Sequence, residues 1–256
     1  MRRGTTLVLA VVAFIPPLLT RPGWIAADTK AYLFLDPGRL LSRAGEMWDA
    51  NVALGTVTHQ NIGYLFPLGP YFWLVDRLPI PMWVGQRIWI GATLFAAGIG
   101  FAWLVRRLSL SGWAVLAGAL VYMLSPYTLA YLGRTTVILL PWAALPWLVG
   151  LARRAGHEGG WRAPAWFALV VTVVGGINAS SLLFIGLGPV LWFPFAVWVS
   201  REIDLRQAVS AMLRIGALLI PTQLWWMAGL SVQAGYGLPI LELTESVKTV
   251  AQTSTA

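Results

Sequence analysis

Seven long apolar stretches, separated by short segments rich in arginine, constrain this chain more than any other feature of its sequence. They run approximately over residues 5–20, 82–105, 113–132, 135–152, 164–180, 182–199 and 209–230. Each is close to the length of about 20 apolar helical residues that crosses a hydrocarbon core of ~30 Å. Hydrophobic residues make up 58% of the chain and charged residues only 11%, whereas soluble domains carry about 25% charged residues. We therefore predict an all-α polytopic membrane protein with seven spans.

Arginines between the apolar stretches predict the orientation of the chain. If Arg2 and Arg3 are cytoplasmic and the spans alternate, seven further arginines also fall on the cytoplasmic side, as the excess of basic residues in cytoplasmic loops requires. These are Arg106, Arg107, Arg153, Arg154, Arg162, Arg201 and Arg206. We therefore expect a multi-pass protein of the plasma (inner) membrane, with residues 1–230 as the transmembrane module. Residues 21–81 would form a first external loop, and residues 231–256 an external tail.

The first external loop is about 60 residues long, and loops of this length are commonly functional. It holds half of the ten carboxylates, namely Asp28, Asp36, Glu46, Asp49 and Asp76. Residues 36–39 are typical of a helix start, with Asp36 as cap and proline at the first helical position. We expect the helix that follows to lie on the membrane surface and to extend to Trp48. Asp36 is therefore assigned as a cap, with a catalytic or metal-binding role as the alternative.

A second interfacial helix is predicted to begin near Pro70, with Tyr71, Phe72 and Trp73 at headgroup level. The alternative is an eighth span over residues 62–75. Prolines and a glycine interrupt that stretch, and it is shorter than the usual minimum for a span. An eighth span would also place Arg106 and Arg107 outside, against the pattern of the other arginines.

Two polar features of the loop are candidates for chemistry. Asp28 lies at the mouth of the first span, where an ionisable group is costly unless it is used; the alternative is a solvated carboxylate or a pair with Lys30. Residues 56–64 place hydroxyl, imidazole, amide and phenol groups between apolar stretches, and such groups suit a ligand rich in hydroxyls. The members of this segment that we take as candidates are His59, Gln60, Asn61 and Tyr64. The alternative is a polar interfacial turn.

Three external arginines are candidates for a phosphate group, because a guanidinium can bind a phosphate with two parallel hydrogen bonds. Arg87 lies near the outer end of the second span, Arg134 follows the third span, and Arg77 stands beside Asp76. Arg87 and Arg134 could instead extend to lipid phosphates. The sequence contains no cysteine and no GxxxxGK[ST], GxSxG or HExxH motif, so it encodes no nucleotide-binding loop or serine hydrolase elbow of these types.

The loop also resembles a known family, the actinobacterial arabinofuranosyltransferase D family of the GT-C superfamily. The residues that carry the likeness are ADTK at 27–30, LDPGR at 35–39, MWD at 47–49 and GTVTHQNIGYLFPLGP at 55–70. The likeness continues more weakly through Gln86-Arg87, residues 125–127, residues 133–135 and Asn178-Ala179. Members of this family are much longer, so the resemblance implies that the chain corresponds to an amino-terminal portion and that residues 231–256 begin a further region.

The resemblance implies a GT-C transmembrane module with interfacial helices in its first loop and an active site on the extracytoplasmic face. It further implies transfer of arabinofuranose from decaprenylphosphoryl arabinose to arabinan of arabinogalactan or lipoarabinomannan, with inversion and formation of α(1→3) branches. The catalytic carboxylate of the superfamily follows the first span, a position that corresponds to Asp28. The resemblance identifies no definite cofactor, and a divalent cation held by Asp28 or Asp36 is one option.

The residues then take specific roles in the implied reaction. Asp28 would act as general base, and Arg87, Arg134 and Arg77 would stabilise the leaving phosphate. His59, Gln60 and Asn61 would hold sugar hydroxyls, and Trp24 or Tyr64 would offer an aromatic face. The alternative function is a non-catalytic carrier or binding subunit for a polyprenyl-phosphate-linked sugar, which needs the same basic and aromatic residues but no base.

Overall fold

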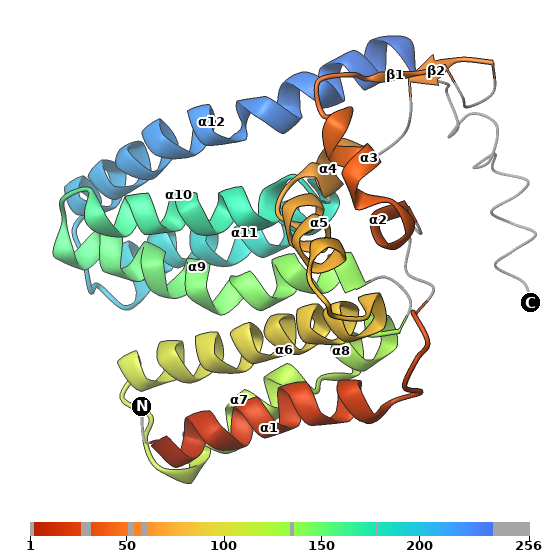
Figure 1. The fold of residues 1–256 in the computed structure, drawn as a ribbon. Helices are drawn as coiled ribbons and strands as arrows, with labels where there is room; N and C mark the ends of the chain where they lie inside the picture. The colour runs from red at the N-terminus through yellow and green to blue at the C-terminus, as the bar shows by residue number, and fades with distance from the viewer. Residues whose placement is uncertain are drawn as a thin grey trace, which may run out of the picture.

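The computed structural model describes residues 3–26, 32–50, 54–57, 61–133, 136–177 and 179–237 (Figure 1). Within this part of the chain, five helical segments are long and apolar enough to cross a bilayer: Met82–Arg107, Trp113–Tyr131, Thr136–Glu158, Ser180–Val199 and Leu205–Tyr236. Two shorter apolar helices are Arg3–Leu19 and Arg162–Gly175. These seven segments fall on the seven apolar stretches of the sequence, which confirms the prediction of an all-α multi-pass membrane protein.

The helices of the bundle are joined by short connections, except for the long segment between α1 and α6. They are α1 (Arg3–Leu19), α6 (Met82–Arg107), α7 (Trp113–Met123), α8 (Pro126–Tyr131), α9 (Leu139–Glu158), α10 (Arg162–Gly175), α11 (Ala179–Pro194) and α12 (Leu205–Tyr236), with a 3-10 turn η1 (Thr136–Ile138) before α9 and a π-helical turn η2 (Phe195–Val199) after α11. The segment between α1 and α6 contains the short elements α2 (Tyr32–Leu35), α3 (Pro37–Ser42), β1 (Trp48–Asp49), β2 (Thr56–Val57), α4 (Asn61–Leu65) and α5 (Leu68–Arg77).

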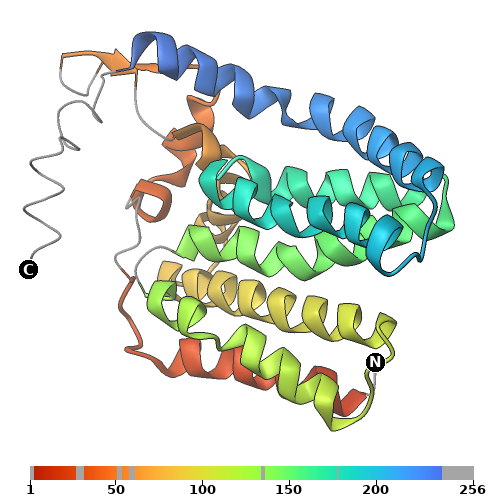
Figure 2. The same ribbon diagram turned by 180° about the vertical axis from the view of Figure 1, so that it is seen from behind.

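The bundle is arranged in layers, and the elements between α1 and α6 cover one end of it. In Figures 1 and 2 the order is α1 with α7, then α6, then α9 to α11, with α12 outermost. Elements α2 to α5 and the β1–β2 hairpin lie at the end of the bundle opposite the N-terminus (Figure 1). We call this the loop end, and we call the opposite end, which carries Arg106, Arg153 and Arg201, the arginine end.

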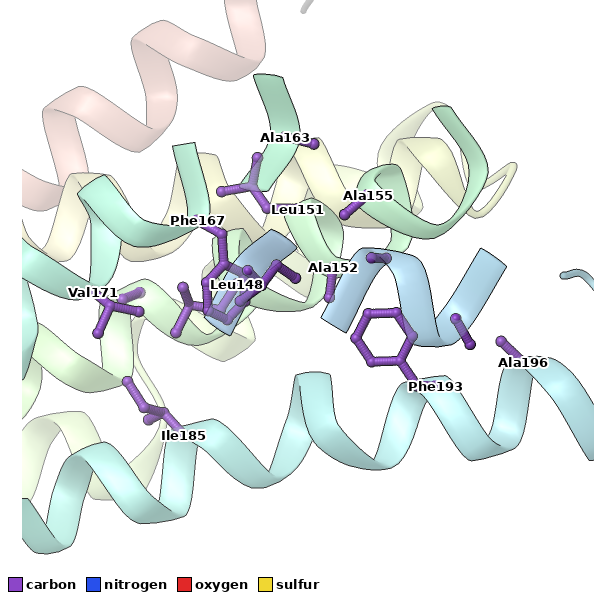
Figure 3. Packing of buried hydrophobic residues seen from close by; sticks show 14 of the residues in the cluster. Leu148, Leu151, Ala152, Ala155, Ala163, Phe167, Val171, Ile185, Phe193 and Ala196 are labelled. Carbon is purple, nitrogen blue, oxygen red and sulfur yellow. The ribbon is translucent and has the colours of Figure 1, made fainter. Parts of the chain in front are cut away.

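Two apolar cores hold the layers together. One joins α1, α6 and α7 through Leu9, Leu94, Val115 and Met123, all at most 3% exposed. The larger core joins α9, α10, α11 and α12 (Figure 3). Its helix crossings use small side chains that let the backbones approach closely, which is how helices commonly pack in lipid. These are Ala152, Ala155, Ala163, Ala196 and Ala211, each at most 1% exposed.

Local signals explain where two spans differ from their predicted bounds. The stretch predicted as one span over 113–132 is divided, because Ser125 caps α8 through a hydrogen bond from the backbone N–H of Thr128 (3.3 Å) and Pro126 occupies its first position. Helix α12 begins earlier than predicted because Asp204 and Gln207 form a reciprocal capping box. With 32 residues it is about 48 Å long, more than a ~30 Å hydrocarbon core needs.

A third apolar cluster connects the loop end to the bundle. It combines Leu33, Phe34, Tyr64, Leu68 and Phe72 with Val137 of η1 and Ile177 of the turn between α10 and α11. The predicted helix at Pro70 exists as α5, but the prediction that Phe72 faces lipid headgroups is wrong. Phe72 is only 1% exposed, because α5 packs this face against Phe34 and α6. The surface helix is predicted to extend to Trp48, but α3 ends at Ser42. Trp48 instead begins strand β1.

Candidate functional site

The segment that leaves α1 is held to α6 by hydrogen bonds to its backbone. The side-chain amide of Gln86 accepts from the Ala26 N–H (2.8 Å) and donates to the Ala26 carbonyl (3.0 Å). The next residue, Arg87, donates from Nη2 to the carbonyl of Trp24 (3.2 Å). Gln86 is 2% exposed and Arg87 is 7% exposed, so both polar groups are taken out of solvent and depend on these partners.

This anchored segment leads directly towards the carboxylate that the sequence singles out. Asp28 lies outside the described residues, two positions after Ala26. The clamp on Ala26 therefore fixes the described chain at the loop end of α6, two residues before Asp28 in the sequence.

Arg87 carries a buried charge without a carboxylate partner in the described part of the chain. Its Nε is buried and has no hydrogen-bond partner there, and the salt bridges of the described residues do not include it. A buried cation normally acquires an anionic partner, because desolvation of an isolated charge is costly. Its surroundings therefore favour an anion near the loop end of α6.

The other two candidate arginines differ from Arg87. Arg77, in the last turn of α5, is exposed and lies over the ring of Trp73, 4.2 Å from its centroid. Arg134 lies outside the described residues. The structure thus places Arg87 and Arg77 at the loop end, one buried and one exposed, but shows no contact between them.

A small hairpin fixes the start of the polar segment over residues 56–64. Strands β1 and β2 pair antiparallel, with Trp48 opposite Val57 and Asp49 opposite Thr56. Arg43 braces β1, because its Nη1 pairs with Asp49 (2.8 Å) and its Nη2 donates to the Trp48 carbonyl (3.0 Å). The hydrogen bond to Asp49 raises the pKa of Arg43 above its ordinary value.

Three glycines allow α4, at the end of that segment, to dock onto the bundle. A Cβ at Gly63 would collide with the carbonyl oxygen of Gly176 in the α10–α11 turn. A Cβ at Gly229 of α12 would collide with Ile62, and one at Gly176 would lie 3.0 Å from the ring of Trp225. The absence of side chains at these positions lets α4 sit between the turn and α12, as Figure 1 shows.

The predicted sugar-binding residues lie between and beside these two anchors. His59 and Gln60 fall outside the described residues, between β2 and α4. Asn61 begins α4, of which only the backbone is described at this position. Tyr64 is 3% exposed within the third apolar cluster, whereas Trp24 is 71% exposed. Of the two aromatic candidates, only Trp24 offers an accessible ring.

Asp36 is a helix cap, as the sequence predicts. Its Oδ1 accepts from the backbone N–H of Arg39 (2.9 Å), and Pro37 occupies the first position of α3. Within the described ranges, no group of three or more His, Cys, Asp or Glu side chains gathers closely enough to hold a metal ion. The described residues therefore do not fit the option of a divalent cation at Asp36.

Sequence reasoning missed the residues that organise this site. Gln86 is a polar residue inside an apolar span, and polar groups at such positions are expensive unless they are used; that signal could have identified it. Gly63, Gly176 and Gly229 gave no such signal, because the sequence does not show which backbones come into contact.

Comparison with known proteins connects this site to a family. A family model described as "Alpha-(1->3)-arabinofuranosyltransferase, N-terminal GT-C domain" matches residues 9–256. Two proteins named alpha-(1->3)-arabinofuranosyltransferase are each 31% identical to the chain: that of Mycobacterium tuberculosis (strain ATCC 25618 / H37Rv) over 96% of the chain, and that of Mycolicibacterium smegmatis (strain ATCC 700084 / mc(2)155) over 93%. The chain spans only 18% and 17% of their respective lengths.

The fold of the chain agrees with the fold of a solved arabinofuranosyltransferase structure. A cryo-EM structure of the arabinofuranosyltransferase AftD from mycobacteria superposes with a TM-score of 0.81 at 27% identity, covering 91% of this chain and 18% of that one. Sequence and fold thus point to one family over nearly the whole chain. The chain belongs to the family of N-terminal GT-C domains of alpha-(1->3)-arabinofuranosyltransferases.

Proposed function

We propose that this chain is the catalytic GT-C module of an enzyme that transfers arabinofuranose from decaprenylphosphoryl arabinose to cell-wall arabinan. The acceptor would be arabinogalactan or lipoarabinomannan, and the new bond an α(1→3) branch formed with inversion. Family membership supports the glycosyltransferase class. The observation that carries the catalytic assignment is the paired hydrogen bonding of Gln86 with Ala26, because it anchors the segment that leads to Asp28.

Asp28 is the proposed general base. Its carboxylate takes the proton of an acceptor hydroxyl, whose oxygen attacks the anomeric carbon of the donor sugar. The bond from that carbon to the phosphate oxygen breaks, and polyprenyl phosphate leaves with the electron pair. This single displacement inverts the anomeric configuration. It needs the base and the acceptor on the face of the sugar opposite the phosphate.

The leaving phosphate requires positive charge as the bond breaks. Arg87 is the strongest candidate, because its buried guanidinium lacks a carboxylate partner among the described residues and retains a free Nε there. We propose Arg134 and the exposed Arg77 as further donors to the phosphate. The Trp24 carbonyl fixes Nη2 of Arg87 and so orients the rest of the guanidinium.

The polar segment would bind the sugars. We propose that His59, Gln60 and Asn61 hold sugar hydroxyls, since the hairpin and α4 anchor the chain on both sides of them. Trp24, with its exposed ring, would stack on a sugar face. Tyr64 supports α4 from within the apolar cluster, a position that favours packing over direct sugar contact.

We further propose that the loop end is extracytoplasmic and that the N-terminus is cytoplasmic, in the plasma membrane. The support is the concentration of arginines at the other end, where Arg106, Arg153 and Arg201 lie, as expected for a cytoplasmic face. In this arrangement residues 1–230 form the transmembrane module, and residues 231–256 are external. A polyprenyl donor could then enter from the outer leaflet.

The test is transfer of labelled arabinose from decaprenylphosphoryl arabinose to a synthetic arabinan acceptor. The assay uses membranes that contain the chain, alone and as a chimera in which it replaces the matching region of the Mycolicibacterium smegmatis relative. We expect transfer in at least one of them, and its loss in Asp28→Asn at unchanged expression. Saturable donor binding without transfer in both would reject the catalytic proposal in favour of a carrier or binding subunit.

A further inference from the structure

We infer that Gln86 is a positioning residue for this reaction: it clamps the backbone of Ala26, two residues before the proposed base Asp28. The inference rests on the proposed function and adds a residue to it. Gln86 lies near the start of α6, but at 2% exposure its side chain is not accessible. It acts through the chain it holds and does not contact substrate.

The clamp uses both ends of the glutamine amide on a single residue. A glutamine side chain has one acceptor oxygen and a donor NH₂ group, and here each pairs with one half of the Ala26 backbone. The two contacts, 2.8 Å and 3.0 Å, reproduce the paired N–H and C=O bonds between neighbouring β-strands. Such double pairing fixes both the position and the orientation of the peptide, which one bond does not.

The segment held by the clamp has little apolar packing of its own. Trp24 is 71% exposed and Ile25 is 39% exposed, and residues 21–23 are exposed as well. Apolar burial therefore contributes little to holding this segment in position. Polar contacts from α6 replace it, through Gln86 to Ala26 and through Arg87 to the carbonyl of Trp24.

A second buried glutamine makes contacts of a different kind. Gln223 in α12 is 4% exposed, but its contacts are with side chains: it donates to Thr172 (3.4 Å) and Thr222 (3.1 Å) and accepts from Trp226 (2.8 Å). It joins α10 and α12 within the bundle, and its hydrogen-bond partners among the described residues include none of the proposed catalytic, phosphate-binding or sugar-binding residues. Gln223 thus provides a matched control of the same residue type and burial.

The experiment compares Gln86→Met, Gln86→Glu and Gln223→Met in the transferase assay, using the chain or chimera that is active. Methionine keeps the length of the side chain and removes both hydrogen bonds, whereas glutamate keeps an acceptor for the Ala26 N–H. We expect kcat to fall about 100-fold in Gln86→Met, the order of effect that displacement of a catalytic group by about 1 Å produces. The kcat of Gln86→Glu should lie between that of Gln86→Met and that of the wild type.

Two further readouts separate positioning from general damage. The donor KM should stay within about twofold of the wild type in both Gln86 variants, because substrate binding is not the function lost. Hydrogen exchange at the Ala26 amide should become faster in Gln86→Met. Gln223→Met should lower the thermal unfolding midpoint at least as much as Gln86→Met but leave kcat within about twofold.

The outcomes separate the inference from the proposed function. If the wild type transfers sugar and Asp28→Asn does not, but Gln86→Met keeps wild-type kcat despite faster exchange at Ala26, the inference is overturned and the proposed function stands. Equal losses of kcat in Gln86→Met and Gln223→Met would also overturn it. If the wild type transfers nothing or Asp28→Asn remains active, the proposed function fails and the inference falls with it.

Discussion

The backbone of Gly63 in α4 packs directly against the carbonyl oxygen of Gly176 in the turn between α10 and α11. This contact joins the polar segment of the first loop to the larger half of the bundle. It requires glycine at position 63, because the opposing atom belongs to a backbone and cannot rotate away as a side chain can.

Gly63→Ala is therefore expected to displace α4. The added methyl group would overlap the Gly176 carbonyl, and overpacking of this kind costs about 1–3 kcal/mol. We expect a lower thermal unfolding midpoint and a strong reduction in transfer activity. Gly186→Ala in α11 is the matched control, since a Cβ there meets no atom within 4 Å. Equal stability and activity in the two variants would contradict the proposed docking of α4.

Arg87→Met is expected to weaken the interaction with the donor. The substitution removes a buried guanidinium that faces no carboxylate among the described residues, and a hydrogen bond to a charged group contributes about 1.5–3 kcal/mol. The donor KM should rise by about 10- to 100-fold. Arg107→Met, at the arginine end beside Trp103, should leave the donor KM unchanged. A normal donor KM in Arg87→Met would remove Arg87 from the phosphate site.

Two substitutions of Asp36 distinguish a capping role from a catalytic role. Asparagine caps helices about as well as aspartate, whereas alanine costs about 0.5–2 kcal/mol. We expect Asp36→Asn to keep both stability and transfer activity, and Asp36→Ala to lose stability through the missing bond to the Arg39 N–H. Loss of activity in a stable Asp36→Asn variant would instead assign the carboxylate to the chemistry.

Glu202 at the arginine end should make stability depend on pH. Its Oε2 lies 3.1 Å from Nε2 of His157 and 3.0 Å from Nη2 of Arg153. Burial by itself would raise the pKa of Glu202, but hydrogen bonds from His157, Ser200 and Arg153 outweigh it and lower that pKa below its ordinary value. Its contribution to stability is therefore present above the unfolded pKa of about 4.3 and is lost as the pH falls through the folded pKa.

Glu202→Gln is then expected to lower stability at pH 7 by at most about 1 kcal/mol, since the pair is partly exposed and screened by solvent. Thermal unfolding measured from pH 7 down to pH 3.5 should show the difference from the wild type narrowing below about pH 4. Asp76→Asn, an exposed carboxylate at the loop end, serves as the control. A difference that stays constant over this range would contradict the role of the Glu202 charge.

Features that depend on neighbours in the chain could be predicted from the sequence. The apolar stretches have the length that a bilayer demands, and their positions agree with the seven apolar helical segments of the structure. The cap at Asp36 was also predictable, because a capping side chain bonds to a backbone group only three residues away. The family resemblance in the first loop was confirmed by a family match over residues 9–256.

Predictions failed where a contact across the fold competes with a local pattern. An aromatic run before an apolar span resembles a headgroup anchor, yet Phe72 is buried because α5 packs onto Phe34 and α6. Trp48 fits the apolar stripe of a surface helix, yet it pairs with Val57 in a hairpin. In each case the partner lies on another element, so the periodicity of the residues along one segment does not predict the contact.

The sequence by itself thus determined the membrane class, the number of apolar helical segments and the family, because each follows from composition, spacing or a contiguous motif. The tertiary structure alone decided what holds the site. Gln86 and Ala26 are 60 residues apart, and Gly63 and Gly176 are further apart still. Only the packing of helices brings such pairs together, because a buried amide or a missing Cβ has no effect until another backbone lies against it.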